Sequence, residues 1–318
     1  DRARLRLILS ELQFLNGDFK TAMVNYHWRL KCHERWGGAP TQPEWQGEPI
    51  DGKSIFVFGE QGVGDQVLFM ALLNDLQTAG ARVLLESDPR LLPLFQRSFP
   101  GVTCVPIENP PAPETLSSDI DYHIAMGSLG CWLWDKFSHR APRPYLLADG
   151  HKTAKLRSKY KDGKNVRLIG ISWKSPYGRF SEMKSLALRE LMPILKLPNT
   201  RFIDLQYGET KAERRELNSD FGVNVVHDVS VNQMNDLDGF AAQIAAMDTV
   251  VSISVSAAHM AGALGVPTYV LLSSAPQWKW GGYEDKTPWY PNVQLLRRDH
   301  GDTCQNQVGR AAKLISAL

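Results

Sequence analysis

Short apolar runs alternate with stretches of helical periodicity along most of this chain. Such runs are typical of strands buried on both faces of a parallel sheet, and the helices between them connect one parallel strand to the next. The pattern predicts an α/β fold with right-handed crossovers and doubly wound sheets. The predicted strands are 54–58, 82–86, 102–105, 121–125, 168–172, 201–205, 223–226, 250–253 and 268–272.

The chain is long enough for two domains. It has 318 residues, of which 43% are hydrophobic and 22% charged, so it can bury two ordinary cores. The periodicity lapses between about 142 and 165 in a Lys-rich stretch, which we interpret as a hinge. We therefore expect two Rossmann-like domains facing a common cleft, at 49–150 and 151–318, after an N-terminal region at 1–48.

The N-terminal region has helical periodicity from Leu5 to about Trp36, interrupted at Asn16-Gly17-Asp18. This predicts two helices joined by a tight turn. The pattern of Leu12, Leu15, Gly17, Phe19, Ala22 and Tyr26 resembles a tetratricopeptide unit. Because one such unit cannot bury its own apolar face, we expect it to end a repeat array or to dock on the next domain.

Composition excludes several classes of protein. The net charge is +2 with acids and bases mixed along the chain, so no basic block indicates a nucleic-acid partner. No apolar run approaches the roughly 20 residues of a membrane span. The four cysteines form no CxxC pair, and Cys32 beside His33 does not make a zinc site. We expect free thiols, a reducing cytoplasmic location and no metal.

A glycine-rich turn, Gly59-Glu60-Gln61-Gly62-Val63-Gly64-Asp65-Gln66, stands between the first predicted strand and helix. In open α/β sheets ligands bind at this end of the strands. The turn lacks the Lys and Ser/Thr of a phosphate-binding Walker loop, and Val67 stands where the dinucleotide fingerprint has a third Gly. Gln61, Gly62 and Gly64 are therefore candidate ligand contacts through the backbone. Asp65 is either a helix-terminus carboxylate or a general base.

A second candidate site lies at 252–267, where a strand runs into small hydroxyl residues and then an Ala/Gly-rich helix. The N-terminus of such a helix favours an anion such as a diphosphate. The alternatives are that Ser256 is only a helix cap and that His259 is a core histidine bonded to backbone. The candidate contacts are Ser254, Ser256, Ala257, Ala258, His259 and Gly262.

Two further stretches could contact a ligand. Trp173 and Lys174 follow the first strand of the second predicted domain, and Gln206 follows the next strand. A lysine there can reach a phosphate, or it can be an ordinary surface lysine. The aromatic loop at 277–291 could stack on a sugar or base ring, or simply pack internally.

Together these segments resemble bacterial tetratricopeptide proteins with a C-terminal glycosyltransferase domain, a domain similar to the lipopolysaccharide heptosyltransferases and distantly to the O-linked N-acetylglucosamine transferases. The segments that carry the resemblance, which spans nearly the whole chain, are Tyr26-His27-Trp28-Arg29, Trp45-Gln46-Gly47-Glu48-Pro49, Gly52-Lys53, Gly59 to Asp65, Trp173, Leu205-Gln206, His259 to Gly265 and Pro288-Trp289-Tyr290-Pro291.

The resemblance implies a GT-B fold, with an acceptor in the first domain and a nucleotide-sugar donor in the second. It implies that Asp65 is the base, that Lys174 contacts phosphate, and that Ser256 to His259 lie over the diphosphate. Heptosyltransferases carry Asp-Thr before this helix, where this chain has Ser254-Val255, so the resemblance does not extend to ADP-heptose as donor.

These features predict an inverting transfer to a hydroxyl acceptor without metal or cofactor, in which Asp65 takes the hydroxyl proton. By resemblance the acceptor is a glycan or a protein such as flagellin, bound by the tetratricopeptide-like helices. Two alternatives stay open. One is an inactive scaffold of the same fold, and the other is an enzyme such as an epimerase that acts on the nucleotide-sugar alone.

Overall fold

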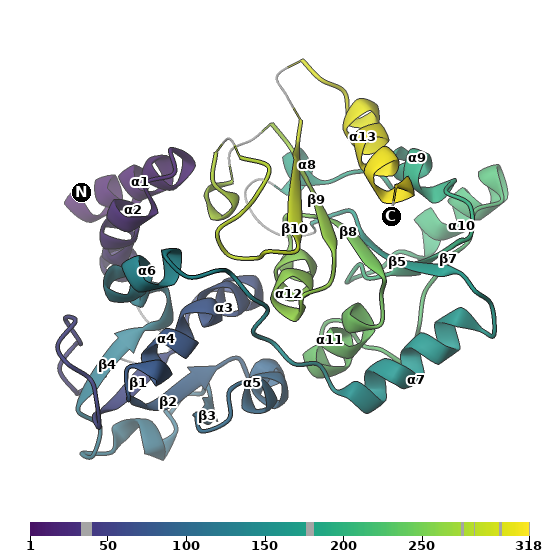
Figure 1. Ribbon diagram of the computed structural model, residues 1–318. Coiled ribbons are helices and arrows are strands. Elements are labelled where there is room, and N and C mark those ends of the chain that lie inside the picture. Colours follow the sequence, from purple (N-terminus) through teal and green to yellow (C-terminus); the bar gives the residue numbers. More distant parts are fainter. Residues whose placement is uncertain (33–39, 176–180, 275–276, 283, 299–300, 318) are drawn as a thin grey trace. The chain divides into compact units, whose positions relative to one another are not determined.

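The computed structural model describes residues 1–318 except 33–39, 176–180, 275–276, 283, 299–300 and 318. The chain divides into two compact units (Figure 1). Unit 1 comprises Asp1–Leu147 together with the segment Trp278–Tyr283, and unit 2 comprises Ala148–Gln277 and Glu284–Leu318. Each unit is built on its own parallel sheet, so the prediction of an α/β fold is confirmed.

The sheet of unit 1 has the order β3-β2-β1-β4, with every neighbouring pair parallel. The central strand β1 pairs with β2 on one side and β4 on the other, and its Ile55, Phe56, Val57 and Phe58 are buried. A parallel strand buried on both faces needs a continuous apolar run, which explains why its sequence signal was clear. The strands are β1 Ser54–Phe58, β2 Arg82–Ser87, β3 Thr103–Pro106 and β4 Tyr122–Ala125.

Short helices follow the strands of unit 1. A 3-10 turn, Met70–Leu72, separates α3 from α4. The helices are α3 Val63–Phe69, α4 Leu73–Thr78, α5 Leu92–Ser98 and α6 Gly130–Ser138, with 3-10 turns at Pro89–Leu91, Pro113–Leu116 and Met126–Ser128. The sequence analysis did not predict α6.

The predicted helical hairpin is present in unit 1. It consists of α1 Arg2–Leu15, α2 Phe19–Tyr26 and a 3-10 turn His27–Lys31. The turn between α1 and α2 uses Gly17 at φ +81°, and Asp18 caps α2 by accepting from the Thr21 amide. The hairpin packs on α6, where a Cβ on Gly130 would lie 2.5 Å from Met23 Sδ.

A segment from the C-terminal half of the chain completes unit 1. Trp278, in the 3-10 turn Trp278–Trp280, stacks on Phe14 with ring centroids 4.7 Å apart and lies 4.9 Å from the ring of Tyr26. Gly282 sits so close to the hairpin that an added Cβ would lie 1.9 Å from the Leu15 carbonyl oxygen. The segment that covers this side of the hairpin is therefore separated from it in the sequence by more than half the length of the chain.

The sheet of unit 2 has the order β10-β9-β8-β5-β6-β7, all parallel. Numbered within the unit, this is the Rossmann strand order, whose switch point lies between β5 and β8. The central strands β8 and β9 are buried at every position. The strands are β5 Arg167–Ser172, β6 Thr200–Asp204, β7 Val225–Val226, β8 Thr249–Ile253, β9 Thr268–Leu272 and β10 Val293–Arg297.

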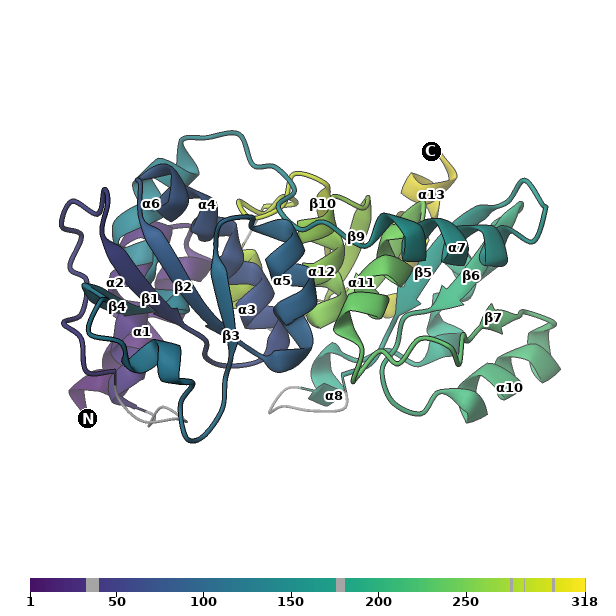
Figure 2. The same ribbon diagram turned by 90° about the horizontal axis from the view of Figure 1, so that it is seen from below.

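Helices cover both faces of this sheet, with α7, α11 and α12 on one side and α9 and α13 on the other (Figure 1; Figure 2 views the first set from below). The sequence analysis did not predict β10 or α13. The helices are α7 Gly150–Lys161, α8 Ser181–Lys184, α9 Met192–Leu195, α10 Lys211–Phe221, α11 Leu237–Ala245, α12 Ser256–Leu264 and α13 Cys304–Ser316, with a 3-10 turn at Leu188–Leu191.

The Lys-rich stretch interpreted as a hinge contains the boundary between the two units, after Leu147, and also the helix α7, which the sequence analysis did not predict. The helix has almost no apolar periodicity of its own, and its stability comes from caps and partners elsewhere in unit 2. Asp149 accepts from the Lys152 amide, and the side chains of α7 form ion pairs with distant carboxylates. These pairs are Lys152 with Asp238, Arg157 with Asp248 and Lys159 with Asp228.

In the parts of the chain that are described, no helix is long and apolar enough to cross a membrane. All four cysteines are free, as predicted. Within the same described ranges, no group of three or more His, Cys, Asp or Glu side chains is arranged to hold a metal ion.

Candidate functional site

The glycine-rich turn lies where predicted, between the end of β1 and the start of α3. A Cβ on Gly59 would lie 2.7 Å from the Glu86 carbonyl oxygen, so a glycine is needed for this close approach to β2. Gln61 has φ +59°, a left-handed conformation that is uncommon outside glycine. Such local strain is typical of functional turns, which makes the turn a candidate ligand site.

Residues of the hairpin hold this turn. Arg29 is buried, and its guanidinium makes a two-pronged contact with Glu60, with Nε 2.9 Å from Oε2 and a second, shorter contact from Nη2 to Oε1. Glu60 Oε1 also accepts from the Gly127 amide at 3.0 Å. Gln61 Nε2 donates to the Tyr26 hydroxyl at 2.6 Å. The hairpin is thus part of the framework of the site, which the sequence pattern did not indicate.

Burial governs the protonation of these groups. Burial raises the pKa of Tyr26, so its hydroxyl keeps its proton and acts as a neutral partner for Gln61. Burial alone would lower the pKa of Arg29, but the charge of Glu60, the neighbouring Tyr26 and the hydrogen bond to Glu60 act together and raise that pKa. The Arg29 guanidinium therefore stays charged across the physiological range.

Asp65 lies in the first turn of α3, but it is not the residue that caps the helix. The cap position is Gly62, which makes no side-chain capping bond. The Asp65 carboxylate is largely buried, and its Oδ1 forms an ion pair with the ammonium of Lys279 in the Trp278–Tyr283 segment. Sequence reasoning placed Lys279 in an aromatic loop and gave it no role.

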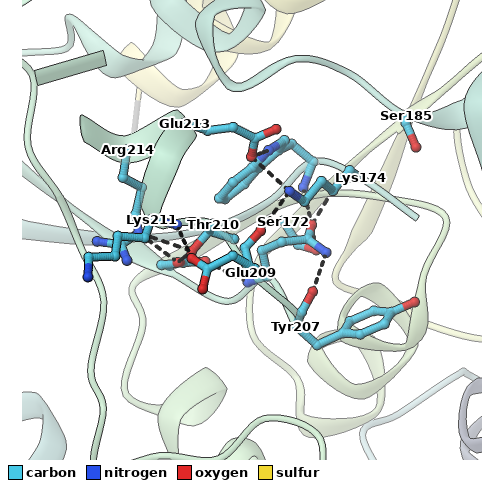
Figure 3. Close-up of polar contacts among 12 residues, drawn as sticks. Ser172, Lys174, Ser185, Tyr207, Glu209, Thr210, Lys211, Glu213 and Arg214 are labelled. Atoms are coloured by element: carbon cyan, nitrogen blue, oxygen red, sulfur yellow. Dashed lines mark hydrogen bonds and ion pairs between the residues drawn. The ribbon is translucent and has the colours of Figure 1, made fainter. Parts of the chain in front are cut away.

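In unit 2, the structure brings Trp173, Lys174 and Gln206 together at the ends of β5 and β6. Gln206 Oε1 accepts from the amides of Trp173 at 3.0 Å and Lys174 at 2.9 Å, so this side chain sets the backbone path after β5. Gln206 and Trp173 are fully buried. Figure 3 shows these contacts around the labelled residues Lys174, Tyr207 and Glu213.

Lys174 is not a free surface lysine. Its Nζ lies 3.0 Å from Glu213 Oε2 and 2.9 Å from the Glu209 carbonyl oxygen (Figure 3). The same Glu213 oxygen accepts from the Trp173 indole at 3.0 Å. The ammonium is thus already neutralised by a carboxylate, and its role as a phosphate contact stays a prediction.

The second candidate stretch lies at the same edge of the sheet, because Ser172 of β5 and Ser252 of β8 are register partners. Helix α12 begins at Ser256, so the N-cap position is Val255, whose side chain makes no capping hydrogen bond. Ser256 is the first residue of the helix and not its cap. The nearby Ala257 and Ala258 are fully buried. The strand ends of the switch point and the α12 N-terminus therefore meet at one edge.

His259 is buried, as the core alternative expected, but its Nδ1 partner is the Tyr290 hydroxyl at 3.0 Å and not a backbone group. Gly262, one turn further on, lies against the same ring, since an added Cβ would be 2.6 Å from Tyr290 Cγ. Helix α12 is thus fixed by Tyr290 of the Trp-Tyr-Pro segment.

Lys184 is a residue that sequence reasoning missed. It lies on α8, and its Nζ donates to the Ser254 carbonyl oxygen at 3.3 Å, immediately before α12. It follows Lys174 along the chain with no local pattern to set it apart. A second lysine therefore lies near the position where the diphosphate was expected.

The aromatic loop packs internally at the positions described. Trp280, Trp289 and Tyr290 are almost fully buried, and Trp278 stacks within unit 1. Tyr283 of the aromatic loop lies outside the described residues, and so does His33, which follows Cys32. The packing interpretation accounts for these tryptophans.

Comparison with known proteins gives a curated relative of this chain. Protein FlbA of Caulobacter vibrioides is 27% identical over 292 residues, which is 84% of this chain and 47% of FlbA. The chain thus spans about half the length of the relative it matches. No protein-family model matches the chain.

Solved structures with a similar fold include glycosyltransferases. A glycosyl transferase family 9 protein from Veillonella parvula has a TM-score of 0.59 at 12% identity, covering 84% of this chain and 91% of that one. The E. coli ADP-heptose lipopolysaccharide heptosyltransferase II has 0.57 at 16%, covering 83% and 100%. The E. coli heptosyltransferase WaaC, solved with ADP, has 0.55 at 13%, covering 83% and 99%. The chain shares the α/β fold of these enzymes.

Proposed function

We propose that this chain is a glycosyltransferase that moves a sugar from a nucleotide-sugar to a hydroxyl acceptor with inversion and without a metal ion. The observation that carries the proposal is the edge of the unit 2 sheet at its switch point. There α12 begins and Lys184 lies at the Ser254 carbonyl. This edge belongs to a fold shared with glycosyltransferases.

The chemistry of that edge suits a nucleotide diphosphate. A helix N-terminus carries unpaired amides and the positive end of the helix dipole, both of which favour negative charge. The ammonium of Lys184 adds a full positive charge beside it. Charge that develops on the departing diphosphate would be stabilised by these groups in the place of a divalent ion.

Asp65 is the proposed base. Its carboxylate takes the proton of the acceptor hydroxyl while that oxygen bonds to the anomeric carbon, and the bond from that carbon to the diphosphate oxygen breaks with its electron pair on the diphosphate. General-base catalysis of this kind contributes about 10²–10⁴-fold in rate.

The acceptor is proposed on resemblance. The hairpin contacts the turn that carries Asp65, so a protein or glycan bound by tetratricopeptide-like helices would approach this turn. A flagellin-like protein is one such acceptor.

A binding screen tests the donor. The purified chain is titrated calorimetrically with ADP-, UDP-, GDP- and CMP-sugars, with and without EDTA, and compared with Lys184→Ala and Lys174→Ala. We expect one nucleotide to bind regardless of EDTA and to bind about tenfold more weakly to Lys184→Ala, as for loss of one charged contact. Absence of binding by all four at millimolar concentration would refute the donor assignment.

One observation favours the alternative of an inactive scaffold of the same fold. Asp65 is already paired with Lys279, and Lys174 with Glu213, so two candidate site residues have partners within the protein. A scaffold would bind the nucleotide without releasing it from its sugar, and Asp65→Asn would leave its biological activity intact.

A further inference from the structure

The pairing of Asp65 with Lys279 has a second interpretation, which rests on the proposed function. We propose that Lys279 is a positioning residue that orients the Asp65 carboxylate for proton transfer. Both residues belong to unit 1, although they lie far apart in the sequence.

The segment that carries Lys279 is fixed on both sides of it. On one side Trp278 stacks on Phe14 and contacts the ring of Tyr26. On the other, Trp280 is almost fully buried and Gly282 lies against the Leu15 carbonyl. Because the backbone is held at these points, the Lys279 ammonium has a defined position.

The target of that ammonium is one oxygen of the carboxylate. Oδ1 of Asp65 is buried against Lys279, whereas Oδ2 lies toward Gly62, 3.6 Å from where a Cβ of that residue would be. The terminal torsion of an aspartate is broad, so a carboxylate without such a contact samples many orientations. Holding Oδ1 leaves Oδ2 on the side of the glycine-rich turn.

Proton transfer then has a defined direction. Oδ2 accepts the proton from the acceptor hydroxyl, while Lys279 stays in contact with Oδ1. Misplacement of a reacting group by about 1 Å can cost about 10²-fold in rate. Loss of Lys279 should therefore lower turnover while leaving donor binding, which we assign to unit 2, unchanged.

Other residues of the hairpin also contact the glycine-rich turn. Tyr26 contacts both Trp278 of the Lys279 segment and Gln61 of the turn. Arg29 holds Glu60, two residues before Gly62. The hairpin thus fixes both the carboxylate's turn and the cation that orients the carboxylate.

The test compares Lys279→Met, Lys279→Arg and Lys286→Met in the full chain. Lys286 is an exposed lysine of the same loop and serves as the control. The assay measures nucleotide released from ADP-, UDP-, GDP- and CMP-sugars in turn, with water as the only acceptor. We expect Lys279→Met to lower kcat about 10–100-fold with KM for the donor within about twofold, and Lys279→Arg to retain most of the activity. Lys286→Met should match the parent.

A double substitution distinguishes positioning from general damage. If Lys279 acts through Asp65, adding Lys279→Met to Asp65→Asn will cause no further loss, because the oriented group is already gone. An equal loss in both backgrounds, or a parental kcat for Lys279→Met, would overturn the proposal. If Asp65→Asn is as active as the parent, the proposed base is wrong, which is a separate result.

A readout without turnover keeps the proposal testable if the parent releases no nucleotide. Carbodiimide labelling of carboxylates, followed by mass spectrometry, reports how accessible Asp65 is. We expect Lys279→Met, still folded by circular dichroism, to increase labelling of Asp65 several-fold, and Lys286→Met to leave it unchanged. Unchanged labelling in Lys279→Met would contradict the ion pair itself.

Discussion

Arg29 and Glu60 form a buried ion pair that joins the helical hairpin to the glycine-rich turn, with side-chain exposures of 4% and 12%. The amide of Gly127, which follows β4, also donates a hydrogen bond to Glu60. Three parts of unit 1 therefore meet at one carboxylate.

Removing one partner of this pair should destabilise the protein strongly. Arg29→Met leaves the Glu60 charge buried and uncompensated, so we expect the free energy of unfolding to fall by about 3–5 kcal/mol. Urea unfolding followed by circular dichroism measures this. Lys20→Met, which breaks an exposed pair with Asp135, is the matched control and should cost no more than about 1 kcal/mol. A similar small effect for both variants would show that the Arg29–Glu60 pair is not structural.

A methyl group at Gly262 should disturb α12. The Cβ of Gly262→Ala would lie 2.6 Å from the Tyr290 ring, so the ring must move and its contact with His259 will change. We expect a loss of about 1–3 kcal/mol in unfolding free energy, as for overpacking of a core. Gly309→Ala in α13 has nothing within 4 Å of the new Cβ and should instead stabilise by about 0.4–1 kcal/mol. A lower midpoint of thermal unfolding for Gly262→Ala and a higher one for Gly309→Ala, each relative to the parent, would confirm both predictions.

Gln206 should be needed for the backbone path after β5. Gln206→Leu removes the acceptor for the Trp173 and Lys174 amides, and each buried donor left unpaired costs about 1–3 kcal/mol. We expect lower stability in urea together with weaker nucleotide binding. Gln305→Leu, at an exposed position of α13, provides the control. Parental binding by Gln206→Leu would separate this segment from the donor site.

Asp228 should contribute a pH-dependent part of the stability of unit 2. Burial acts to raise its pKa, but hydrogen bonds from Lys159, Ser230 and Tyr160 outweigh burial and lower the pKa to about 2. Because the folded pKa lies below the value of about 3.9 in the unfolded chain, the stabilisation is fully present above about pH 4 and is lost as the pH falls through 2. Comparing the parent with Asp228→Asn by unfolding at pH 7 and at successively lower pH should show a difference that shrinks below pH 4. A constant difference would contradict the ion pair with Lys159.

Strands β1 to β9 could be predicted because each contains a local apolar run, and β1 begins and ends where the sequence indicated, whereas β10 was missed. Helix α7 was missed because its stability comes from ion pairs with residues outside its own sequence. No sequence pattern around Lys184 or Lys279 marks either residue as part of a site. Each contacts a residue far away in the sequence, Ser254 or Asp65, and only the fold brings these pairs together. Backbone turns were thus predictable, whereas the cations around them were not.

The segment Trp278–Tyr283 has a consequence for how such proteins can recombine. A gene fragment ending at Leu147 would encode the hairpin and the first sheet without the tryptophan that covers Phe14 and Tyr26. An exchange of N-terminal halves between two such proteins would then pair each hairpin with a foreign segment. Functional chimaeras should therefore require two inherited pieces, and the hairpin and this short segment should change together during divergence.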